Sequence, residues 1–184
     1  MTIDEIFTVL ASHMIKGMMV HEQLMNTYRF LGLNGYAKCH EYHYICETKG
    51  YIKLSTYKLE HYGSLVKQGP FEIPEIIPES WFGFTRSAVD AETRHKAMVA
   101  ALEEWIKWER QTRDLYVSVF DELMQQDQVA TAEFIKTYIL DVEDELVYAT
   151  NEKIHKTSMG YDIVSIVEEQ GKLSRFFGKK IHKS

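Results

Sequence analysis

The sequence has 184 residues, of which 45% are hydrophobic, and this length predicts one compact domain with a sizeable core. It contains 21 Lys and Arg against 27 Asp and Glu, a formal charge of -6. This charge argues against a nucleic-acid partner, because such binding depends on neutralising phosphates. An acidic chain suits metal cations better.

The start of the chain and its cysteines indicate a cytoplasmic protein. The polar, acidic start "MTIDE" lacks the basic segment of an export signal, and no apolar run reaches membrane-spanning length. Cys39 and Cys46 lie in one predicted helix, about 10 Å apart along its axis, which is too far for a disulfide. We therefore expect reduced thiols and no membrane insertion.

Helix is predicted for almost the whole chain. Two long helices, at about 3–31 and 36–65, flank the glycine-bracketed turn "GLNG". All three prolines lie in "GPFEIPEIIPES", which predicts a connection at about 66–90. Two further helices, at about 91–124 and 130–156, flank the polar turn "QQDQ", and a shorter fifth helix follows at about 162–177, broken or ended near Gly171.

The lengths of the connections predict the topology. Short turns make neighbouring helices antiparallel, so the first four helices form two hairpins. The long connection between the hairpins has enough residues to run the length of a bundle, which lets the second and third helices lie parallel. We therefore predict an all-α fold: one four-helix bundle over residues 1–184, with a long crossover and a short C-terminal helix.

Four glutamates, one in each long helix, are predicted to face the core. Apolar residues at helical spacing surround Glu22, Glu47, Glu109 and Glu143. In the fourth helix, Glu143 is expected to point inward, whereas Glu145 is expected to point away. Folding each hairpin about its turn brings Glu22 level with Glu47, and Glu109 level with Glu143. Four buried carboxylates without basic partners carry a large desolvation cost, which one or two bound cations would relieve.

At this point the sequence resembles the ferritin family over nearly its whole length. The resemblance lies in "MMVHEQLMNTY", "GYAKCHEYHYICE", "ALEEWIKWERQT" and "FIKTYILDVEDEL", one segment from each long helix, and in the proline-rich crossover. It implies that Glu22, Glu47, Glu109 and Glu143 hold iron at a two-metal centre. It also implies Fe(II) oxidation and a homo-oligomer that forms a hollow, iron-storing shell.

The sequence departs from the ferritin pattern at two positions. The second helix of ferritins carries Glu-x-x-His, and here Gly50 follows Glu47; Arg29 stands where the first helix usually has a tyrosine. His43 lies one turn before Glu47 and offers another nitrogen ligand. Gly50 has two interpretations: a vacated ligand position, or a place where a neighbouring helix must approach closely.

Three functions agree with this pattern. The first is a ferritin-like protein that binds and oxidises iron, or a related divalent metal, and stores it. The second is a non-enzymatic bundle with a degenerate metal site. The third is a di-metal oxidase of a small organic substrate, for which Gly50 would leave space beside the metal.

Overall fold

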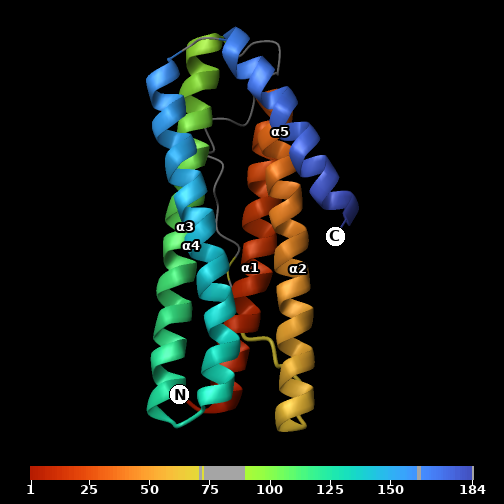
Figure 1. Ribbon diagram of the computed structural model, residues 1–184, viewed down its shortest axis with the longest axis vertical. Coiled ribbons are helices and arrows are strands. Elements are labelled where there is room, and N and C mark those ends of the chain that lie inside the picture. The colour runs from red at the N-terminus through yellow and green to blue at the C-terminus, as the bar shows by residue number, and fades with distance from the viewer. Residues whose placement is uncertain (71, 73–89, 161–162, 184) are drawn as a thin grey trace.

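The computed structural model describes residues 1–70, 72, 90–160 and 163–183. Within these ranges the regular structure is helical: α1 (Ile3–Phe30), α2 (Asn34–Tyr62), α3 (Ala91–Gln125), α4 (Val129–Met159) and α5 (Ile163–Lys183). The first four helices lie side by side, and α5 crosses one end of the bundle on the side of α2 (Figure 1). The predicted all-α bundle with an additional C-terminal helix is confirmed.

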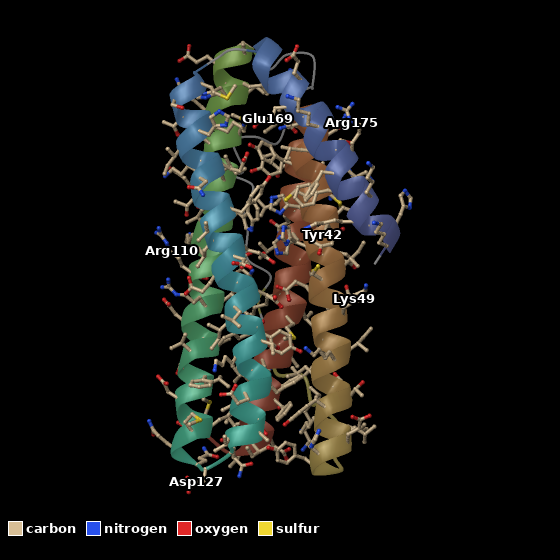
Figure 2. The ribbon with its side chains drawn as sticks, in the orientation of Figure 1. Tyr42, Lys49, Arg110, Asp127, Glu169 and Arg175 are labelled. Carbon is tan, nitrogen blue, oxygen red and sulfur yellow. The ribbon has the colours of Figure 1, made fainter. Side chains whose placement is uncertain are left out.

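The helices pair as two antiparallel hairpins, α1 with α2 and α3 with α4, and α1 also packs on α3. The chain turns at Gly32, whose φ of 77° favours glycine, and at Asp127 (Figure 2), whose φ is 57°. Figure 1 shows α2 and α3 running in the same direction, as the predicted topology requires. Most of the predicted crossover, at about 66–90, lies outside the described residues.

Two of the bundle helices, α1 and α3, begin where the sequence provides a side-chain cap. The Thr2 side chain accepts a hydrogen bond from the Glu5 backbone, and the Glu5 carboxylate accepts one from the Thr2 backbone. Asp90 caps α3 by accepting from the Thr93 backbone at 2.8 Å. Such caps satisfy backbone N–H groups that have no partner in the first turn.

The core follows a heptad pattern in every long helix. Residues spaced alternately by three and four positions form a seam that faces the other helices. The seams are Phe7, Leu10, Met14, Gly17, His21, Leu24 and Tyr28 in α1; Tyr36, His40, His43, Glu47, Gly50 and Leu54 in α2; Met98, Leu102, Trp105, Glu109, Thr112, Tyr116, Val119 and Leu123 in α3; and Ile135, Tyr138, Val142, Glu145 and Ala149 in α4. The seams are apolar toward the ends of the bundle and polar near its middle.

The fifth helix is longer than predicted. It continues through Gly171 to Lys183, although the sequence suggested a break or an end near this glycine. Buried residues on both sides of Gly171, Gln170 and Phe177, anchor α5 and keep it continuous. The Tyr36 backbone N–H also donates to Gln170 Oε1 at 3.0 Å, which joins the start of α2 to α5.

No helix in the described ranges has both the length and the apolar character needed to cross a membrane. Both cysteines, Cys39 and Cys46, are free thiols, as predicted.

Candidate metal centre

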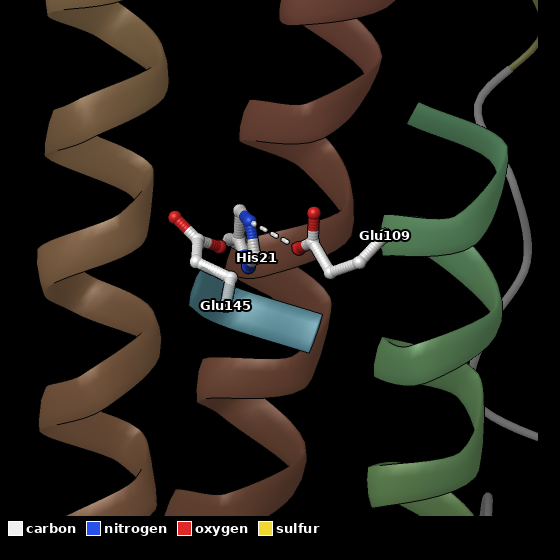
Figure 3. Close-up of side chains that lie close together, drawn as sticks. All are labelled: His21, Glu109 and Glu145. Atoms are coloured by element: carbon white, nitrogen blue, oxygen red, sulfur yellow. Dashed lines mark ion pairs between the residues drawn. The ribbon is translucent and has the colours of Figure 1, made fainter. Parts of the chain in front are cut away.

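Three side chains from three helices meet near the middle of the bundle. His21 of α1, Glu109 of α3 and Glu145 of α4 each place one ligand atom so that all three atoms lie within 4.8 Å of one another. His21 and Glu109 are each only 1% exposed, and Glu145 is half-buried. Figure 3 shows the two carboxylates on either side of the imidazole, with His21 Nε2 3.6 Å from Glu109 Oε1.

Two further histidines, both from α2, extend this cluster. His40 and His43 are buried, and their rings pack on the His21 ring with centroid separations of 5.3 and 5.4 Å. His43 Nδ1 lies 3.0 Å from Glu145 Oε1. The centre therefore has ligand-type side chains from all four helices of the bundle.

Contacts around His21 and Glu109 hold both side chains in place. His21 Nδ1 lies 3.0 Å from His40 Nδ1, so one ring donates to the other. The Trp105 indole N–H donates to Glu109 Oε1 at 2.9 Å. If His21 Nδ1 carries the proton, His21 Nε2 presents a lone pair to the centre, which is the tautomer that a metal ligand needs.

Glu47 of α2 reaches the same region because Gly17 of α1 makes room for it. A Cβ placed on Gly17 would lie 2.6 Å from Glu47 Oε1, so any larger residue would displace this carboxylate. Glu47 lines a cavity together with His21, His43 and Glu145. The carboxylate of Glu47 therefore lies beside the three-residue cluster.

Burial determines whether Glu47, Glu109, His21 and His40 carry a charge. Burial, together with repulsion from Glu145, raises the pKa of Glu47 to about 8 and raises the pKa of Glu109 well above its usual range. Burial also lowers the pKa of His21 to about 3 and lowers that of His40 well below its usual value. In the metal-free protein near pH 7, these four side chains are mainly neutral.

His43 and Glu145 are the charged pair in this centre. Burial alone would lower the pKa of His43, but Glu145 and Cys39 outweigh it and raise the pKa well above its ordinary value. Burial would likewise raise the pKa of Glu145, but His43 together with a hydrogen bond from Glu109 lowers it. A protonated Glu109 can donate this hydrogen bond, which agrees with its raised pKa.

The structure brings together three of the five side chains that the sequence suggested as ligands, namely Glu47, Glu109 and His43. The other two, Glu22 and Glu143, are exposed, so the expectation that they face the core is wrong. Glu143 Oε1 instead lies 3.9 Å from the Arg113 guanidinium at the surface. A helix turns about 100° per residue, so an error of one or two positions in a stripe moves a side chain from the core to solvent.

His21 and Glu145 are the residues that the sequence prediction missed. His21 directly precedes Glu22, and Glu145 follows Glu143 by two positions. Both lie on the heptad seams, whose spacing continues from Met14 through Gly17 to His21, and from Tyr138 through Val142 to Glu145. This spacing is a signal in the sequence, but the neighbouring run through Met18, Glu22 and Met25 shares it.

Comparison with solved structures identifies the fold. The chain is similar to an engineered closed form of the ferritin of Archaeoglobus fulgidus, with a TM-score of 0.75 and 16% identity over 95% of this chain and 96% of that chain. It is also similar to the open-pore ferritin of the same archaeon (TM-score 0.74, 17% identity, 92% and 93% covered) and to a humanised archaeal ferritin (0.76, 16%, 93% and 94%). No protein-family model and no curated protein matches the sequence.

The protein therefore has the ferritin-like four-helix bundle fold, and a possible metal site of His and Glu side chains lies buried within it. At 16–17% identity the likeness concerns the fold. The chemistry has to be argued from the side chains of this chain.

Proposed function

We propose that this protein binds iron, or a related divalent metal, inside the bundle and oxidises it. The observation that supports this proposal is the convergence of His21, Glu109 and Glu145, whose ligand atoms lie within 4.8 Å of one another in a buried site. Glu47 and His43 share a cavity with two of these residues and are the proposed ligands of a second ion.

The donor set fits such a metal. Imidazole nitrogen suits iron, zinc, copper and nickel, and carboxylate oxygen suits harder cations, so a mixed set favours a first-row divalent metal. The buried carboxyls of Glu47 and Glu109 stay neutral without a metal, and a bound cation would stabilise their charged forms. Three glutamates and two imidazoles are enough for one or two ions.

The residues around the ligands would orient them and limit access of water. The ring of His40 supports the Nδ1 side of His21, and Trp105 holds one oxygen of Glu109. The apolar seams above and below the centre limit the access of water along the bundle axis. Bound iron would supply the redox chemistry.

Metal binding by purified protein tests this proposal. We expect the wild type to bind Co(II), used as a spectroscopic probe, and Fe(II). Variants Glu109→Gln and Glu145→Gln, which keep the side-chain shape, should lose at least about tenfold in affinity, the loss typical even of residues that only support ligands. Glu22→Gln and Glu143→Gln are matched controls next to His21 and Glu145, and both should bind as the wild type does.

Equal Co(II) affinity in all four variants would contradict the assignment of Glu109 and Glu145 as metal ligands. Absence of metal binding would instead support the non-enzymatic bundle with a degenerate site, and metal binding without oxidation of Fe(II) would support the di-metal oxidase of a small organic substrate. Dioxygen consumption on addition of Fe(II) alone, without an organic substrate, would support the ferritin-like oxidation activity.

We also propose a homo-oligomer that could store iron as a shell. Leu140, Val147 and Ile154 of α4 are 61%, 60% and 63% exposed, and their seven-residue spacing places them on one face of the helix. An apolar face of this kind favours burial against another subunit.

A further inference from the structure

A cavity of about 260 Å³ runs from the candidate metal centre to the surface between α2 and α4. His21, Glu47 and Glu145 line its inner end, whereas the exposed residues Lys49 and Lys53 line its outer end. Lys49 lies near the middle of α2 (Figure 2). This volume is just below the range of about 300–1,000 Å³ that is usual for drug-sized ligands, so it suits a small molecule.

The walls between the two ends are mainly apolar. Met14, Tyr116, Tyr138 and Val142 line them, one or two residues from each of α1, α3 and α4. Met14, Tyr116 and Val142 are buried elements of the heptad seams. A flexible thioether beside aromatic rings adapts well to an alkyl chain.

Gly50 keeps this cavity open from the side of α2. A Cβ at this position would lie 3.5 Å from Tyr138 Cε1 and 3.7 Å from Met14 Cε, which is ordinary contact, so close helix packing does not require glycine here. Any longer side chain would extend into the cavity. Glycine within a helix destabilises it by about 1 kcal/mol relative to alanine. At Gly50, the structural feature that accompanies this loss is the unfilled cavity.

The two ends of the cavity differ in charge. At the outer end, the exposed Lys53 lies near one carboxylate, Asp141, whereas the inner end has two carboxyls and no lysine. Lys53 Nζ lies 5.3 Å from the Tyr138 ring centroid, which places its charge over the apolar wall. At the inner end, an anionic group would meet Glu47 and Glu145. An anion therefore fits the outer end and an apolar chain fits the inner part.

We propose that this cavity binds a small organic monocarboxylate, with its carboxylate near Lys53 and its alkyl chain between Met14, Tyr138 and Val142. The binding does not depend on the proposed metal site, although the chain would end beside it. A second cavity of about 490 Å³, under α5, shares His43 and Glu145 with the first and has its own lysine, Lys180. The experiment must therefore distinguish the two cavities.

Calorimetric titration with three probes of equal chain length tests the head-group preference. Hexanoate should bind, hexanol should bind more weakly, and hexylamine should bind most weakly of the three. Lys53→Met should weaken hexanoate by about two- to fivefold, because the lysine is exposed. Lys180→Met should leave the affinity unchanged. Loss of binding in Lys180→Met alone would place the ligand in the second cavity and overturn the proposal.

Variants that fill the cavity test the location of the alkyl chain. Gly50→Leu and Val142→Phe fill it from α2 and α4, and each should abolish hexanoate binding if folded, as judged by circular dichroism. Gly50→Ala is the matched control, because its Cβ makes only ordinary contacts, and it should still bind. Wild-type affinity in a folded filled variant, or no binding by the wild type at millimolar hexanoate, would overturn the proposal.

Metal content measured in the same preparations separates this inference from the proposed function. Hexanoate binding without Co(II) binding would support the proposed ligand of the cavity and contradict the proposed metal site. Co(II) binding without hexanoate binding would retain the metal site and reject the cavity ligand.

Discussion

Gly17 determines where the Glu47 carboxylate can lie. A Cβ at this position would come within 2.6 Å of Glu47 Oε1, but the carboxylate is the flexible end of its side chain and can move. We therefore expect Gly17→Ala to fold, with a gain in helix propensity of about 1 kcal/mol, and to bind Co(II) about tenfold more weakly. Optical titration with Co(II) measures the affinity.

Gly171→Ala is the control for this change. Nothing lies within 4 Å of a Cβ at Gly171, so its helix propensity should improve without any effect on Co(II) binding. If Gly17→Ala bound Co(II) as tightly as the wild type, Glu47 would have no part in the metal centre.

The buried carboxyls predict how stability depends on pH. The pKa of Glu47 is raised from 4.5 to about 8, and those of Glu109 and His43 are also raised. Groups with raised pKa stabilise the fold fully at low pH and lose this contribution as the pH rises through the folded-state pKa. The pKa of His21 is lowered from 6.5 to about 3, so this residue has the opposite effect: below pH 6.5 it destabilises the fold increasingly as the pH falls.

Between pH 6.5 and pH 8, the groups of this centre with a raised pKa, namely Glu47, Glu109 and His43, determine how the stability changes with pH. We expect the metal-free protein to become less stable over this window, and the metal-loaded protein to change less, because a cation stabilises the ionised carboxylates. Urea unfolding with and without EDTA measures the difference. Glu47→Gln should reduce the slope of the metal-free protein; a metal-free protein that gains stability between these pH values would contradict the protonation states.

Sequence reasoning identified some residues of the centre and not others for a physical reason. Apolar neighbours at helical spacing pointed to all four glutamates, and Glu47 and Glu109 are the two that lie on the heptad seams. Glu22 was chosen because partly buried residues such as Met18 resemble core in a sequence, and Glu143 because the exposed Leu140 and Val147 do. Only the three-dimensional contact with α3 and α4 distinguishes the buried seam from its flank.

The crossing of α5 over α2 depends on Gly35. A Cβ on Gly35 would lie 2.7 Å from the backbone oxygen of Gln170 and 2.8 Å from Leu173 Cβ, and backbone cannot move aside cheaply. We expect Gly35→Ala to lower the free energy of unfolding by about 1–3 kcal/mol, as overpacking does. Thermal unfolding measures the loss, and hydrogen exchange should show faster exchange in α5.

Gly178→Ala provides the comparison within α5 itself, because no atom lies within 4 Å of a Cβ there. It should be neutral or stabilising. Unchanged stability in Gly35→Ala would mean that α5 is not held by this contact.

The elements themselves were more predictable than the side chains. The glycine-bracketed and polar turns, the proline-rich connection and the long helical runs between them predicted the four bundle helices, and these signals are local in the sequence. The end of α5 was not predictable in this way, because its continuity past Gly171 depends on Gln170 and Phe177 packing on other helices. Tertiary contacts outweigh the weak helix preference of a glycine.

For the whole molecule, the apolar face of α4 predicts the mode of assembly. If Leu140, Val147 and Ile154 pack against another subunit, a charge at the centre of this face should prevent the contact. We expect the wild type to have the mass of an oligomer by light scattering at micromolar concentration, and Val147→Lys to shift toward the monomer.

Ile52→Lys is the matched control, because Ile52 is 57% exposed and lies on α2. It should retain the mass of the wild type. A monomeric wild type would exclude both the oligomer and storage in a shell, and loss of assembly in Ile52→Lys alone would place the interface on α2.

The neutral state of the centre has a consequence for metal uptake itself. If the buried core keeps its net charge, each divalent ion that enters must displace on the order of two protons, from Glu47, Glu109 or His43. The bundle would then act as an ion exchanger, taking up metal and acidifying its surroundings. Calorimetric titration of Co(II) in Pipes and in Tris at pH 7 should give different heats, and their difference counts the protons released.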